Sequence, residues 1–195
     1  VAAISMGPPN AEATLKKGIE VNQGYQGGYL RLGSLYAKQH AYDRAIQQYE
    51  SAIKVNPSFL PSYMHLGLLY DQLGQPQKAN QQYEQALRLN PRFAPAANNL
   101  ASNYSEHGGN IDVALTLAQT AKEQFPDNPS ISDTLGWIYY KKGVYRSAIA
   151  LLQDSVRQQP EKPVYHFHLG MAYFKSGDTV QARQALTRAL QPKQD

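Results

Sequence analysis

Hydrophobic residues recur along this chain at the spacing of amphipathic helices. One segment places Tyr63, Leu66 and Tyr70 at positions i, i+3 and i+7, and the stretch from Ala79 to Leu87 repeats that spacing. In a helix of 3.6 residues per turn, such residues form one apolar stripe with polar residues on the opposite face. The pattern therefore predicts pairs of short helices, and no part of the chain predicts a strand.

The same set of residue types returns after 34 positions. The first set is Tyr29, Leu32, Gly33, Tyr36, Ala45, Tyr49, Ala52 and Pro57, and the second is Tyr63, Leu66, Gly67, Tyr70, Ala79, Tyr83, Ala86 and Pro91. One residue inserted in the turn at 105–110 shifts the third set, and later sets return to the original spacing. The predicted units are 26–59, 60–93, 94–128, 129–162 and 163–195, preceded by a leader at 1–10 and an isolated second helix of a partial repeat at 11–25.

These units resemble the tetratricopeptide repeat, a helix–turn–helix of 34 residues with this order of aromatic, Leu, Gly, Tyr, Ala and Pro. The resemblance implies an all-α, right-handed α-solenoid whose inner groove is lined by the first helix of each repeat. It covers residues 26–195. The chain departs from the family pattern where Ala97, Ser132 and His166 replace the first large aromatic and where Ala101 replaces a glycine.

Small residues and prolines mark how the helices meet and end. Gly or Ala at the eighth place of each repeat, such as Gly33 and Gly67, leaves room for the second helix to approach. Glycines such as Gly74 follow helix ends, where the left-handed backbone conformation suits them. Asn56 and Pro57 end a second helix because the residue before proline avoids the α region. Tyr residues at the eleventh place are expected in the core.

Composition narrows the classes of function. Of 195 residues, 42% are hydrophobic, enough to bury a core, and none is cysteine, which excludes thiolate metal sites and cysteine nucleophiles. Nineteen Lys and Arg against fifteen Asp and Glu give a formal charge of +4. Because phosphate binding needs clustered positive charge, a net charge of only +4 argues against nucleic acid as a partner. The compartment stays open, with a bacterial cytoplasm or envelope both compatible.

No catalytic or cofactor motif is present. The chain has no phosphate-binding loop, nucleophile elbow or HExxH zinc motif. His166 and His168 are two residues apart and so lie on different helix faces, where one metal does not readily reach both. We therefore expect no enzyme activity, no cofactor and no metal.

The resemblance assigns the groove to the second, fifth, sixth, ninth, twelfth and thirteenth places of each repeat. The candidate partner-binding residues at these places are Leu30, Met64, Leu68, Asn98, Asn99, Trp137, Tyr140, Phe167, Met171 and Phe174. Chaperone-binding members hold a C-terminal carboxylate with Lys and Asn, but here the corresponding places carry Leu30, Ser34, Pro61 and Pro95. The sequence therefore predicts no carboxylate clamp.

Aromatic residues gather at the groove places of the last two repeats and predict an exposed binding surface. Exposed rings at this density are typical of interfaces, and the paired Asn98 and Asn99 could bond a peptide backbone. On this interpretation, Trp137→Ala and Phe174→Ala weaken binding with little change in stability, whereas replacing Tyr139 or Tyr173 costs about 3–5 kcal/mol.

The predicted function is a non-catalytic scaffold that binds a protein or peptide segment in its groove. Two alternatives remain open. The chain could be an assembly element that self-associates through its uncapped terminal helix, or an accessory segment of a larger bacterial envelope or secretion complex. The former follows because end units of repeat arrays normally need a polar capping helix.

Overall fold

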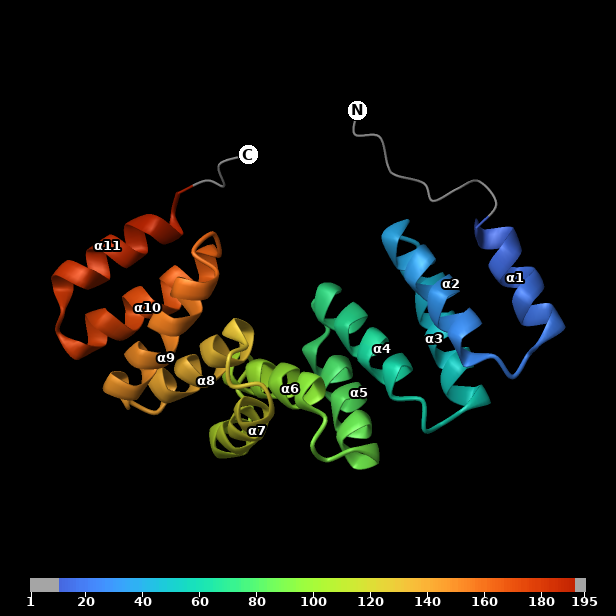
Figure 1. Cartoon of the computed structure of the whole chain (residues 1–195), viewed down its shortest axis with the longest axis horizontal. Coiled ribbons are helices and arrows are strands. Elements are labelled where there is room, and N and C mark those ends of the chain that lie inside the picture. The colour runs from blue at the N-terminus through green and yellow to red at the C-terminus, as the bar shows by residue number, and fades with distance from the viewer. Residues whose placement is uncertain (1–10, 192–195) are drawn as a thin grey trace. The chain divides into compact units, whose positions relative to one another are not determined.

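The computed structural model describes residues 11–191, which form eleven α-helices and contain no strand (Figure 1). The helices are α1 (Ala11–Val21), α2 (Gln26–Lys38), α3 (Tyr42–Val55), α4 (Leu60–Gln72), α5 (Pro76–Leu89), α6 (Ala94–Glu106), α7 (Ile111–Gln124), α8 (Pro129–Lys141), α9 (Tyr145–Gln158), α10 (Pro163–Ser176) and α11 (Thr179–Ala189). The prediction of an all-α chain built from helix–turn–helix repeats is confirmed. The predicted leader at 1–10 and the last four residues lie outside the described part.

Local residue chemistry sets the helix ends. Proline occupies the first turn of five helices, where its missing N–H costs nothing: α4, α5, α6, α8 and α10. Asn110 and Asn128 cap α7 and α8 by accepting backbone N–H groups through their side chains. In four repeats the turn between the helices holds a glycine at positive φ, but the first repeat has His40 there, at φ 59°.

The helices form two compact units, α1–α5 and α6–α11. Within each unit, the two helices of a repeat pack against each other, and the first helix of a repeat also packs on the preceding second helix, as α4 does on α3 and α10 on α9. The first unit's core gathers on Leu32, Tyr36 and Tyr49. The second unit's core is rich in alanine, including Ala101, Ala114 and Ala118.

Glycines at the eighth place let paired helices approach closely, as the sequence predicts. A Cβ built on Gly67 would lie 2.5 Å from the ring of Tyr83, and one on Gly33 would lie 2.5 Å from the ring of Tyr49. Real Cβ atoms essentially never come so near another atom, so any larger residue forces a shift. In the third repeat both partners are small, Ala101 and Ala118, so alanine fits where the other repeats require glycine.

The eleventh-place tyrosines pack on the core as expected, but of the five only Tyr36 is fully buried. Tyr139 and Tyr173 are half-buried, although their rings pack against the core. Each hydroxyl accepts a hydrogen bond from a glutamine of the preceding second helix, Gln119 and Gln153. Because the hydroxyl ends reach the surface, these rings bury less area than Tyr36, which is 2% exposed.

A cluster of polar groups holds α1 on the next repeat. Arg44 donates to Glu12 at 2.7 Å and Tyr36 donates to the same oxygen at 3.0 Å, while Lys16 pairs with Glu12 along α1. Arg44 also stacks over the Tyr36 ring. Hydrogen bonds from Lys16, Tyr36 and Arg44 lower the pKa of Glu12 to about 2. The docking of α1 therefore depends on an ionised carboxylate.

Candidate partner-binding surface

The aromatic residues predicted at the groove places of the second unit do come together. Helices α8 and α10 pack side by side. Trp137 from α8 stacks on Tyr140 of the same helix and meets Phe167 from α10. Met171 and Phe174 continue along the same face of α10 at a helical spacing. We call Trp137, Tyr140, Phe167, Met171 and Phe174 the aromatic cluster.

Trp137 is buried, so the expectation of an exposed tryptophan is wrong. Its side chain is 6% exposed, because both faces of the indole are covered. The Tyr140 ring stacks at 4.4 Å and 5°, and the His168 ring stacks at 4.1 Å and 16°. The repeat register assigns Trp137 to a groove place, but side chains from α8 and α10 close over its ring. Trp137 therefore supports the surface from below.

Phe167 and Phe174 form the exposed part of the cluster. They are 43% and 56% exposed, and Tyr140 and Met171 are half-buried beside them. Phe167 and Phe174 both belong to α10, which packs on α9 and on α11. A partner side chain laid against these rings would bury further apolar area without first ordering a loop.

A buried histidine–aspartate contact lies next to Trp137 of the cluster. His168 Nδ1 is 3.0 Å from both carboxylate oxygens of Asp133, and both residues are less than a tenth exposed. Burial raises the pKa of Asp133, and the hydrogen bond and charge of His168 oppose that rise. Because the same imidazole stacks on Trp137, the pair fixes the ring that supports the surface.

The two histidines, interpreted from sequence as ordinary helix residues, make separate contacts in the structure. His166 Nε2 lies 2.8 Å from the carbonyl oxygen of Pro160, whereas His168 turns to Asp133. Sequence reasoning missed the pair with Asp133. The signal was present in the repeat register, since residues 133 and 168 are at the fifth and sixth places of successive repeats, on helices that pack together.

The two asparagines have different environments. Asn98 is 7% exposed and its Oδ1 accepts no hydrogen bond from the residues described, while Asn99 is half-buried. The expectation that Asn98 lies open in the groove is therefore wrong. The Nε1 of Trp137 is likewise buried and has no acceptor within residues 11–191. Such orphaned polar atoms are uncommon in folded proteins, and both lie on first helices of the second unit.

The candidate residues of the first unit differ in how far they are exposed. Leu68 is 48% exposed on α4, as predicted for a surface contact. Met64 is buried at 9% exposure, which corrects the expectation of an open side chain, and Leu30 is half-buried against the core. Only Leu68 among them offers a large free apolar surface.

The described residues contain neither a metal-binding cluster nor a membrane-spanning helix. Within residues 11–191, no group of three His, Asp or Glu side chains is placed to hold a metal ion. In the same part of the chain, no helix has both the length and the apolar character to cross a membrane.

Comparison with known proteins identifies a family model and structural neighbours. Models described as tetratricopeptide repeat match residues 28–59, 64–129 and 134–195. A comparison with curated protein sequences finds no match.

Solved structures of similar fold share little sequence with the chain. YrrB, described as a TPR protein with an unusual peptide-binding site, superposes with a TM-score of 0.74 at 20% identity, over 92% of each chain. MamA 41-end from Desulfovibrio magneticus RS-1 has a TM-score of 0.71 at 18% identity, over 85% of this chain and 93% of that one. The Cut9-Hcn1 structure of the APC/C matches with a TM-score of 0.77 at 19% identity, over 93% of this chain and 36% of the other. At these identities the likeness extends to the fold alone.

Proposed function

The chain belongs to the tetratricopeptide repeat family, and we propose that it is a non-catalytic scaffold that binds a protein segment on the aromatic cluster of its second unit. Proteins of this family are in general scaffolds for protein interactions. The observation that carries the finer proposal is the exposure of Phe167 and Phe174 on a rigid, packed base.

The energetics favour these two rings as anchors. Burying apolar surface contributes about 25 cal/mol per Å², so a phenylalanine that is half-exposed here still has substantial area to bury. The Trp137 ring beneath is clamped by Tyr140 and His168, and so Phe167 packs on a fixed neighbour. A preorganised surface loses little side-chain entropy on binding, which is typical of interface hot spots.

The surrounding charges indicate a neutral, apolar partner segment. Asp133 contacts His168, and Lys141 lies 5.0 Å over the Trp137 ring, so the charged side chains nearest the indole are already engaged. The residues at the clamp places, including Leu30 and Ser34, do not suit a C-terminal carboxylate. A peptide ligand accords with the peptide-binding site described for YrrB. We propose neither nucleic acid nor a chaperone C-terminus as the ligand.

A second candidate function is self-association through the last helix. Val180 and Leu190 at the two ends of α11 are 65% and 85% exposed, which is more than Phe174. A dimer that covers these side chains would bury the apolar surface that they expose. Sedimentation equilibrium across a hundredfold range of concentration tests it: a constant monomer mass contradicts self-association.

Selection from a phage-displayed random peptide library tests the first proposal. Peptides selected on the intact chain are expected to lose about thirtyfold in affinity towards Phe174→Ala by fluorescence anisotropy, the equivalent of about 2 kcal/mol for an interface hot spot. Phe125→Ala is the matched control, because Phe125 is also half-exposed but lies at the end of α7, outside the cluster. Peptides that bind Phe174→Ala and the wild type equally would contradict the proposal.

A further inference from the structure

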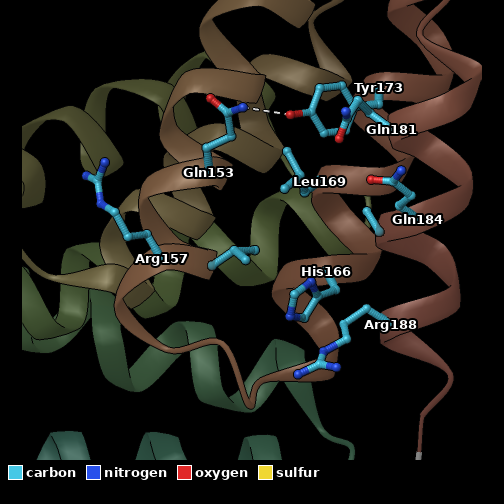
Figure 2. A pocket seen from close by; sticks show the side chains of 10 residues that line it. Gln153, Arg157, His166, Leu169, Tyr173, Gln181, Gln184 and Arg188 are labelled. Atoms are coloured by element: carbon cyan, nitrogen blue, oxygen red, sulfur yellow. Dashed lines mark hydrogen bonds between the residues drawn. The ribbon is translucent and has the colours of Figure 1, made fainter.

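A second surface of the second unit has the features of a binding site. An open groove of about 500 Å³ runs between α9 and α11, with α10 as its floor (Figure 2). Leu169 and Tyr173 contribute the apolar floor, and Gln181, Gln184 and Arg188 line the α11 side. Phe167 and Phe174 are not among the lining residues, so the groove is separate from the aromatic cluster. Its size is within the usual range for ligand sites, about 300–1,000 Å³.

The charge of the groove is positive and concentrated in one group. Its lining includes Arg157 and Arg188 and no carboxylate. Arg157 donates to Asp154 and is thereby neutralised, and Figure 2 shows its side chain directed away from Arg188. Arg188 makes no ion pair with any residue of the described chain, and its Nη1 donates only to the neutral Gln191 at 3.0 Å. Among the described lining residues, Arg188 therefore offers its guanidinium, which suits a single carboxylate in a two-point contact.

Neutral polar groups line the groove beside this charge. Gln181 and Gln184 are three residues apart on α11 and so share a face, and their side-chain amides form no hydrogen bond within residues 11–191. Each amide offers a donor and an acceptor, the same pair that a peptide bond offers. His166 Nε2 is committed to the Pro160 carbonyl, to which it donates because a carbonyl oxygen only accepts.

We propose that this groove binds an acidic peptide segment of a partner protein in an extended form. A carboxylate pairs with Arg188, the backbone bonds to the amides of Gln181 and Gln184, and an apolar side chain lies on Leu169 and Tyr173. A polyphosphate fits less well, because it needs several converging cations and, within residues 11–191, Arg188 is the one lining guanidinium without an ion pair. The chain would then hold two different segments, a neutral one on the aromatic cluster and an acidic one in this groove.

The test uses the intact chain labelled with ¹⁵N and a capped hexapeptide of alternating leucine and aspartate. Titration is followed by the amide resonances, and the same peptide with asparagine in place of aspartate is the neutral probe. The acidic peptide is expected to shift amides around Gln184 and Arg188, and Arg188→Gln is expected to weaken its binding about tenfold or more. Arg183→Gln is the matched control, since Arg183 carries the same charge on α11 but does not line the groove. That variant should bind as the wild type does.

The outcomes distinguish this groove from the aromatic cluster. Shifts at α11 that require both the carboxylates and Arg188 support the proposal. Equal shifts with the neutral peptide, equal weakening by Arg188→Gln and Arg183→Gln, or no shift at millimolar peptide would overturn it. Shifts confined to Phe167 and Phe174 would also overturn it, while leaving the proposed function of the cluster intact.

Discussion

Replacing Gly67 with alanine tests whether close helix approach determines the packing of a repeat. The added Cβ would lie 2.5 Å from Cε1 and 2.9 Å from Cζ of Tyr83. That ring cannot swing away easily, because it is 0% exposed and its hydroxyl donates to Asp71 at 2.6 Å. Overpacking of this kind costs about 1–3 kcal/mol, and the better helix propensity of alanine returns about 0.5–1. We therefore expect Gly67→Ala to lower the free energy of unfolding by about 1–2 kcal/mol.

A double-mutant cycle makes the cause explicit. Tyr83→Ala alone should cost about 3–5 kcal/mol, as for other buried aromatics. In that background, Gly67→Ala should be neutral or stabilising, since the new methyl group enters the space the ring has left. The doubly substituted repeat then carries alanine at both places, the combination that the third repeat already has in Ala101 and Ala118. The expected coupling is about 2 kcal/mol.

Urea unfolding followed by circular dichroism at 222 nm measures both steps. Gly18→Ala is the control, because a Cβ on that helical glycine meets no atom within 4 Å. It should stabilise the chain by about 0.5–1 kcal/mol. If Gly67→Ala stabilises the chain as Gly18→Ala does, or if its effect is the same with and without Tyr83, the close contact does not govern this packing.

Three further predictions concern other parts of the chain. His40→Gly should stabilise the chain by about 0.5–1 kcal/mol in the same urea assay, since glycine relieves a residue at positive φ; a loss of stability would show that its 2.7 Å contact with Tyr42 matters more. The pKa of Glu12 is lower in the folded protein, so the ionised Glu12 stabilises the docking of α1 fully above about pH 4.5, and this effect is lost as the pH falls towards 2. Hydrogen exchange of the α1 amides should rise as the pH falls through that window. Glu12→Gln should remove this pH dependence. Trp137→Ala should destabilise by about 3–5 kcal/mol in thermal melts, whereas Phe174→Ala should change stability by less than about 0.5, and equal losses would refute the division into supporting and contacting rings.

The repeat register made most of the fold predictable. A period of 34 residues with glycine opposite an aromatic ring, as at Gly33 and Tyr49, specifies both the helix pairs and their close approach. The Ala101 departure is explained by Ala118, a residue one helix away that the register also identifies. These features are local to a repeat, and so one sequence period contains them.

The burial of the groove residues was less predictable. The repeat register says on which face of a helix a residue lies, but it does not say which side chains of neighbouring helices cover that residue. The register assigns Trp137 to the groove, yet the rings of Tyr140 and His168 stack on its indole. Met64 and Asn98, also assigned to groove places, are buried as well. Exposure depends on the sizes of side chains from two or three helices at once, which no single period encodes.

Intrinsic fluorescence of Trp137, the only tryptophan in the chain, tests the central claim most directly. The indole packs against Tyr140 and Phe167, so a segment that binds the aromatic cluster must change its surroundings. Titration with a selected peptide that lacks tryptophan is predicted to change the emission in a saturable manner, with the same Kd that anisotropy gives. An emission spectrum that stays constant while anisotropy saturates would place the partner elsewhere and contradict binding at the cluster.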